Sequence, residues 1–153
     1  MDVDVILQRV RAAGLKLTPQ RLAIVRELAT DPTHPTAQEL YERLRREQPT
    51  MSFATVYNTL DALAAAGLCS SLALAPGPSR FDANMHPHDH LVCDGCGLVR
   101  DVRRAVEGGA DAVAGPVKVA LADGFQIRAV EQIYRGLCAS CASSDRALAP
   151  RPS

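Results

Sequence analysis

Four of the five cysteines form two identical pairs, Cys93-x-x-Cys96 and Cys138-x-x-Cys141. Each pair can direct two sulfurs at one ion from a single turn, and two such turns complete a tetrahedron of thiolates around zinc. This requirement brings together two turns that 41 residues separate in the sequence. The pairs therefore predict a structural zinc site that ties the C-terminal segment back onto the preceding strands, with metal binding coupled to folding.

The cellular compartment determines whether the paired cysteines bind a metal ion or form disulfides. The N-terminus, Met1-Asp-Val-Asp-Val, lacks the basic and apolar regions of a signal peptide, and no apolar run approaches the roughly 18–20 residues of a membrane span. We therefore expect a cytoplasmic protein with no membrane partner. Thiols stay reduced there, which favours zinc over a disulfide framework or a redox pair. We expect Cys69, which stands outside the pairs on an apolar stretch, to be an ordinary core or surface thiol.

A second group of possible metal ligands is made of histidines and aspartates. Three histidines alternate in His86-Pro-His88-Asp-His90, so on an extended segment their side chains face one side. Asp82 precedes them, and Asp101 follows on a predicted neighbouring strand. Imidazoles with carboxylates suit an exchangeable Fe(II), Mn(II), Ni(II) or Zn(II) ion, and ligand type alone does not choose among these. The alternative is a solvated, histidine-rich loop; His34, alone in another loop, would by itself be expected to be simply exposed.

Composition gives no general argument for nucleic-acid binding. The 153 residues include 17 basic and 17 acidic side chains, and 47% hydrophobic residues indicate a folded globular chain. Residues 1–75 are equally balanced, with 8 of each charge. Any contact with DNA must therefore come from local placement of charge.

The N-terminal half predicts helices followed by a hairpin. Helix starts are indicated by Thr18-Pro19, by the capping box Thr36-x-x-Glu39 and by Ser52. Leu40, Tyr41 and Leu44 are expected to point inward. Helices are predicted over residues 3–13, 18–29, 36–48 and 53–66, and strands over 68–75 and 80–83. This order predicts a winged helix-turn-helix domain over residues 1–83, with helix 53–66 in the recognition position.

The second half predicts a small α/β domain over residues 84–141, which makes the whole chain α+β. Strands at 91–92 and 98–102 flank the first cysteine pair and place it on a turn, and strand 125–134 leads to the second pair. Residues 105–122 have a helical tendency interrupted by glycines and a proline. The Ser-, Ala- and Pro-rich residues 142–153 are expected to be a disordered tail.

Several motifs in consistent order over residues 5–141 resemble the ferric uptake regulator family of metal-responsive repressors. They are Gly14-Leu-Lys-Leu-Thr-Pro-Gln-Arg21, His34-Pro-Thr-Ala37, Ser52-x-Ala-Thr-Val-Tyr57, Arg80-Phe-Asp82 and His88-x-His90-Leu-Val-Cys93-x-x-Cys96-Gly97.

The resemblance implies a homodimer in which each chain joins a DNA-binding winged helix to a dimerisation domain. A regulatory ion, Fe2+ or Mn2+, would bridge the two domains and stabilise the orientation that binds a palindromic operator in double-stranded DNA. The regulatory ligands that the resemblance implies are His34, Asp82, His88, His90 and Asp101. The residues implied to contact DNA bases or backbone are Lys16, Arg21, Ser52, Thr55, Tyr57 and Asn58.

Within the family, the peroxide-sensing branch fits best. In that branch the ligands are three histidines and two aspartates, and the recognition helix reads Tyr-Asn. This chain has the aspartates Asp82 and Asp101 and the pair Tyr57-Asn58. Iron sensors commonly have Glu as the carboxylate ligand and Tyr-Arg in the helix. The branch implies that bound Fe(II) reacts with hydrogen peroxide. This reaction oxidises the imidazole of one ligand, His34 or His88, and the protein then releases the operator. His86 is an added histidine, a possible extra ligand that gives a run like that of nickel sensors, so iron, manganese or nickel uptake control remains the alternative.

Two other classes of function compete with a repressor. A two-His-one-carboxylate site could serve a non-haem iron oxygenase, although no substrate-binding domain is evident and five ligands leave few open positions. A zinc-stabilised interaction module without regulated DNA binding is the other. We expect a regulator and not an enzyme.

Overall fold

A computed structural model of the chain describes residues 3–74, 77–86, 88–102 and 132–143. The chain divides into two compact units, Met1–His86 and Pro87–Ser153. This division falls three residues after the predicted domain boundary at residue 83.

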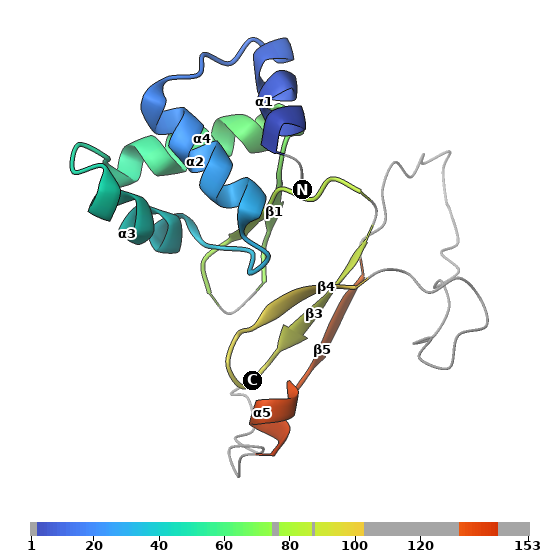
Figure 1. The fold of residues 1–153 in the computed structure, drawn as a ribbon. Helices are drawn as coiled ribbons and strands as arrows, with labels where there is room; N and C mark the ends of the chain where they lie inside the picture. The colour runs from blue at the N-terminus through green and yellow to red at the C-terminus, as the bar shows by residue number, and fades with distance from the viewer. Residues whose placement is uncertain (1–2, 75–76, 87, 103–131, 144–153) are drawn as a thin grey trace, which may run out of the picture. The chain divides into compact units, whose positions relative to one another are not determined.

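Four helices make up most of the first unit (Figure 1). Three of them begin where the sequence predicts, because the side chains of Thr18, Thr36 and Ser52 each accept a hydrogen bond from the amide three residues later. Thr36 also forms the predicted capping box with Glu39. The helices are α1 (Val3–Ala12), α2 (Pro19–Thr30), α3 (Ala37–Glu47) and α4 (Phe53–Ala65).

The apolar faces of the four helices pack into one core. Val10, Ile24, Leu40, Val56 and Leu60, which represent all four helices, are each 0% exposed. Burial of a side chain of this size contributes about 1.5–3 kcal/mol, so the core stabilises these helices more than their intrinsic propensity does.

A two-stranded antiparallel hairpin completes the first unit. Its strands, β1 (Ser70–Leu72) and β2 (Arg80–Asp82), are shorter than predicted. The reason is that the helix end uses the residues before β1: Gly67 has φ +65°, and the amide of Leu68 donates to the carbonyl of Leu63 at 2.9 Å. Four helices followed by this hairpin confirm the predicted winged helix-turn-helix, with α4 in the recognition position.

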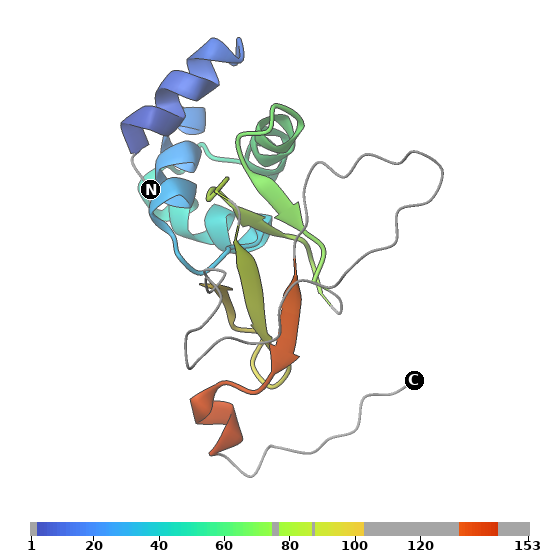
Figure 2. The same ribbon diagram turned by 90° about the vertical axis from the view of Figure 1, so that its right-hand side faces the viewer.

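The second unit is built on a three-stranded sheet. Strand β3 (Asp89–Cys93) lies between β4 (Val99–Val102), which is antiparallel to it, and β5 (Ile133–Gly136), which is parallel. A short helix, α5 (Ala139–Ala142), follows β5 at the end of the sheet (Figure 2). The sequence predicted the three strands in outline but not α5, whose four residues carry no side-chain cap.

Three predictions fall on other parts of the chain. The interrupted helix at 105–122, most of the strand at 125–134 and all but two residues of the tail at 142–153 lie outside the described residues. Ala142 is the last residue of α5 and not part of an irregular tail. Among the described residues, no helix combines the length and apolar character that crossing a membrane requires.

Candidate metal centres and DNA-binding helix

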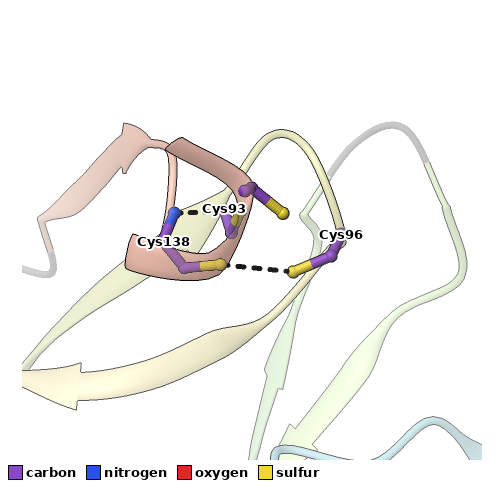
Figure 3. Close-up of side chains that lie close together, drawn as sticks. Cys93, Cys96 and Cys138 are labelled. Atoms are coloured by element: carbon purple, nitrogen blue, oxygen red, sulfur yellow. Dashed lines mark hydrogen bonds between the residues drawn. The ribbon is translucent and has the colours of Figure 1, made fainter. Parts of the chain in front are cut away.

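The four paired cysteines meet at one end of the second unit. Cys93 ends β3, Cys96 lies in the turn before β4, Cys138 precedes α5, and Cys141 lies within α5. The sulfurs of Cys96 and Cys138 lie 3.8 Å apart, and the amide of Cys138 donates to the Cys93 sulfur at 3.2 Å (Figure 3). The first pair therefore occupies the turn between two strands that the sequence predicted.

The sulfur geometry fits a tetrahedral ion. One sulfur from each cysteine belongs to a set of ligand atoms that all lie within 4.8 Å of one another. Zn–S bonds of about 2.3 Å at tetrahedral angles place sulfurs about 3.8 Å apart, as Cys96 and Cys138 are. The arrangement thus needs little adjustment to enclose zinc.

The ionisation of these thiols also favours a cation. The Ser140 hydroxyl, 3.1 Å from the Cys138 sulfur, lowers the pKa of Cys138 to about 6. Hydrogen bonding to Cys138 raises the pKa of Cys141 to about 12, because the proton stays on one sulfur when its neighbour is ionised. A divalent cation among the sulfurs stabilises their negative charges, so that every ligand can be a thiolate.

Two histidines and an aspartate form a separate group on the sheet of the second unit. His88 precedes β3 and His90 lies within it, with their Nε2 atoms 3.0 Å apart. Asp101 lies opposite His90 in the β3–β4 register, and its Oδ1 is 3.6 Å from His88 Nε2. The strand predicted to carry Asp101 beside the histidines is therefore present.

The first unit contains a histidine–aspartate pair of its own. His34 Nε2 lies 3.7 Å from Asp82 Oδ2, and the two residues are 3% and 6% exposed. His34 follows α2 in the loop before α3, while Asp82 ends β2. The expectation that a lone loop histidine is exposed is therefore wrong for His34.

Backbone geometry sets His34 apart. Among the described residues, it is the one non-glycine residue with positive φ, at +54°. The left-handed region costs an ordinary residue roughly 1–2 kcal/mol, and a residue before proline is further biased toward extended conformations. His34 precedes Pro35, so contacts from elsewhere must hold it. The carbonyl of His34 accepts from Arg80 Nη1 at 2.9 Å, a role for Arg80 that its place in the sequence did not reveal.

The atoms of both histidine groups suit a first-row transition ion. Two nitrogens bound at about 2.1 Å and at right angles lie about 3.0 Å apart, the separation of His88 and His90. Wider ligand angles give the 3.6 Å and 3.7 Å separations of the two His–Asp pairs. His86 is exposed at the end of the first unit, and its predicted place on one face with His88 and His90 stays a prediction.

The predicted DNA contacts lie on the helical unit. Tyr57 and Asn58 are exposed on α4, Tyr57 at 52%. The Ser52 and Thr55 hydroxyls lie 2.8 Å apart at the start of α4, where Ser52 caps the helix. Before α2, Lys16 is exposed; Arg21, half-buried on α2, donates to the carbonyl of Lys16 at 2.9 Å. Recognition-helix residues with exposed polar groups are suited to DNA, and their contacts with it stay a prediction.

The sequence matches the ferric uptake regulator family over residues 12–123. The chain belongs to this family. It is 40% identical over 100 residues to the peroxide-responsive repressor PerR of Staphylococcus aureus (strain Mu50), a match that covers 65% of this chain and 68% of the relative.

Solved structures agree with this assignment. A zinc-bound manganese uptake regulator is 30% identical with a TM-score of 0.60 over 64% of this chain and 75% of that chain. The Vibrio cholerae ferric uptake regulator is 28% identical with a TM-score of 0.61, covering 86% and 98%. PerR from Streptococcus pyogenes is 27% identical with a TM-score of 0.51, covering 91% and 92%.

Membership in the family settles the class of function. The family consists of metal-responsive transcriptional regulators that bind DNA and are dimeric, and not of enzymes. The alternative of a non-haem iron oxygenase is thereby excluded, and the α+β architecture with an N-terminal winged helix agrees with that of the solved relatives.

Proposed function

We propose that this regulator is a metal-dependent transcriptional repressor that responds to hydrogen peroxide. The observation that carries the proposal is the nature of its hard ligands: both carboxylates beside histidines are aspartates, Asp82 with His34 and Asp101 with His88. The 40% identity to peroxide-responsive repressors of Staphylococcus aureus supports the same branch, as does Tyr57-Asn58 on α4.

In this proposal the four cysteines hold a structural zinc ion. Their sulfurs fit a tetrahedral site, and all four come from the second unit. Zinc with four thiolate ligands has no open position for chemistry, so its role is to fix the turn of Cys96 to the segment of Cys138.

A second, regulatory ion would use ligands from both units, namely His34, Asp82, His88, His90 and Asp101. An ion that binds all of them only when the units are correctly oriented stabilises that orientation, and by linkage the DNA-binding form. Fe(II) bound there would supply the redox reaction with hydrogen peroxide, whereas Mn(II) would not.

The response to peroxide resides in the ligand imidazoles. The imidazole of His34 or His88 gains one oxygen atom, and the other oxygen of the peroxide leaves as water. An oxidised imidazole is a poorer ligand, so the ion is lost and the orientation that it stabilised is lost with it. Substitution of His86 by alanine tests whether this histidine adds a ligand.

An exposed apolar surface of the second unit is the proposed homodimer interface. The second unit exposes Leu91 and Leu137, at 46% and 41%, beside an apolar groove of about 480 Å³ that Tyr134 also lines. Exposed apolar patches mark protein contacts, and we assign this one to the homodimer. Two recognition helices related by a two-fold axis would read a palindromic operator in the cytoplasm.

Manganese uptake control is the second candidate. The observation in its favour is the 30% identity to a zinc-bound manganese uptake regulator. Imidazoles and carboxylates also bind Mn(II), so the ligand set serves both functions and the reaction with peroxide separates them.

The test begins with selection of duplexes from a random pool by the Mn(II)-loaded protein. Palindromic sequences should be enriched, and fluorescence anisotropy should show binding that is lost on chelation and restored by Mn(II). The Fe(II)-loaded protein should then release the duplex after brief exposure to low hydrogen peroxide, while the Mn(II)-loaded protein retains it. DNA binding that does not depend on Mn(II) or Fe(II) would indicate a zinc-stabilised module. Metal-dependent DNA binding that hydrogen peroxide does not change would indicate control of metal uptake.

A further inference from the structure

We infer that Arg80 is a positioning residue for the regulatory ion, which it serves by holding the His34 backbone so that the imidazole faces Asp82. Arg80 has no place among the proposed ligands. Its guanidinium donates to the carbonyl of His34 at 2.9 Å. The inference rests on the proposed function, since it takes His34 as a ligand.

The need for such a residue arises at the His34 backbone. With φ at +54° and Pro35 next in the chain, His34 holds a conformation that its own sequence disfavours twice. Strained backbone persists where surrounding structure holds it, and such positions concentrate at functional sites. Without its outside contacts, the loop would relax toward an extended conformation and redirect the imidazole.

Strand β2 supplies these contacts from one face. Alternate residues of a strand point to the same side, so Arg80 and Asp82 point together toward the loop. Arg80 binds the carbonyl of His34, and Asp82 Oδ2 lies 3.7 Å from its imidazole. Between them, the amide of Phe81 donates to the carbonyl of Pro35 at 2.9 Å, and Thr36 forms a β-bridge with Arg80. One short strand therefore holds both the backbone and the side chain of the same histidine.

The guanidinium is itself held in place. Arg80 Nη1 lies 3.2 Å from Glu39 Oε2, which also accepts from the amide of Thr36 at 2.7 Å. The capping box at the start of α3 thus fixes Arg80 as well as the helix. Arg80 is only partly buried, its side chain 23% exposed, so its replacement leaves the apolar core intact.

The consequence is a ligand prepared before the ion arrives. A histidine already directed toward Asp82 loses less conformational freedom on binding metal than a mobile one. Partners that orient a ligand typically contribute about 10- to 100-fold to metal affinity. We expect Arg80→Met, which keeps an apolar stem and removes the donors, to weaken Mn(II) binding by about tenfold.

A double-mutant cycle tests whether the effect passes through His34. Mn(II) affinity is measured by electron paramagnetic resonance of the free ion for the full zinc-loaded chain and for Arg80→Met, His34→Ala and the double variant. Arg45→Met is the matched control, because Arg45 packs over Tyr41 on α3 and not on the loop. Far-UV circular dichroism and metal-free melting establish that each variant is folded, and Arg80→Lys, which keeps a cationic donor, should stay within about threefold of the wild type.

The outcomes separate the two claims. The inference predicts a loss of about tenfold from Arg80→Met in the wild-type background and no further loss in the His34→Ala background. An unchanged affinity, or an equal loss in both backgrounds, overturns it. If His34→Ala itself leaves Mn(II) affinity unchanged, His34 is not a ligand and the proposed regulatory site fails, and this inference fails with it.

Discussion

The two candidate metal centres differ in where their ligands come from. All four paired cysteines belong to the second unit, on a turn between strands and at a short helix, with the amide of Cys138 hydrogen-bonded to the Cys93 sulfur. The ligands proposed for the regulatory ion are divided in the chain, with His34 and Asp82 in the first unit and the others in the second. A centre complete within one unit holds its ion whatever the orientation of the two units. Ligands divided between units can make binding depend on that orientation.

The chemistry of the ligands follows the same division. Four thiolates bind zinc tightly and leave no open position, which suits permanence. Imidazoles and carboxylates bind several first-row ions with moderate preference, which suits exchange. The proposed structural and regulatory roles therefore differ both in ligand type and in the placement of the ligands in the chain.

The largest expected effect breaks the thiolate centre. Cys138→Ser removes one of the four sulfur ligands, so bound zinc should fall from about one ion per chain to well below half. Elemental analysis of the purified variant measures this. Cys69→Ala is the control: burial raises the pKa of Cys69 to about 12, its sulfur donates to the carbonyl of Leu60, and the variant should keep its zinc. Full zinc content in Cys138→Ser would refute a four-thiolate site.

The next effect concerns the exchangeable centre. His88→Ala should weaken Mn(II) binding by about 100-fold while zinc content stays unchanged, because it removes an imidazole and leaves every thiolate in place. Titration of zinc-loaded protein with Mn(II) provides the measurement. The matched control is His86→Ala, two residues earlier and exposed, for which we expect less than about a threefold change. Equal losses from the two variants would make His86 a ligand.

A conservative change of a carboxylate separates binding from peroxide chemistry. Asp101→Glu lengthens the side chain by one methylene and displaces the carboxylate, yet it keeps the charge. Mn(II)-dependent DNA binding should persist, and histidine oxidation in the Fe(II)-loaded protein should slow by about tenfold or more, since small misplacements are costly in reactions. Peptide mass spectrometry after timed peroxide exposure follows the rate. A fully sensitive variant would remove the main support for the aspartate-based assignment.

The smallest expected effect lies in the first unit, at the loop before His34. Asp31 accepts hydrogen bonds from the amide and hydroxyl of Thr33 and pairs with Arg43 at 2.7 Å. Burial tends to raise the pKa of Asp31, but the bonds from Thr33 and Arg43 outweigh it and lower the pKa below 3.8. Asp31→Asn keeps an acceptor for Thr33 and loses the charge, so it should cost about 1 kcal/mol near neutral pH.

The stabilisation that the Asp31 carboxylate provides should depend on pH. Because the folded-state pKa is depressed, the ionised carboxylate contributes its full stability above the unfolded pKa and loses it as pH falls through the folded pKa. The difference in unfolding free energy between wild type and Asp31→Asn should therefore be constant above about pH 5 and shrink below about pH 4. Urea unfolding at several pH values measures it, and a difference that grows on acidification would contradict the assignment.

Local signals were sufficient for much of the fold. Thr18, Thr36 and Ser52 carry side chains that cap helices, so the starts of α2, α3 and α4 were predictable from three residues. The strands predicted on either side of the first cysteine pair likewise placed Asp101 on the neighbour of the strand that carries the histidines, as observed in the β3–β4 register. These features depend on neighbours in sequence or across one tight turn.

Features set by distant contacts were not predictable in this way. The left-handed backbone of His34 opposes the preference that Pro35 imposes, and its carbonyl accepts a hydrogen bond from Arg80, 46 residues away in the sequence. Helix α5 has only four residues and no capping side chain, so neither a periodic pattern nor a cap indicates it in the sequence. Resemblance to the family implied that His34 is a ligand, whereas its loop position alone suggested the opposite.

Intact mass spectrometry of the Fe(II)-loaded protein, before and after low hydrogen peroxide, tests the central claim most directly. With peptide mapping, we expect a gain of one oxygen on the peptide that contains His34 or His88, and no such gain when Mn(II) replaces Fe(II). Absence of histidine oxidation while metal-dependent DNA binding persists would contradict peroxide sensing and make the protein a regulator of metal uptake.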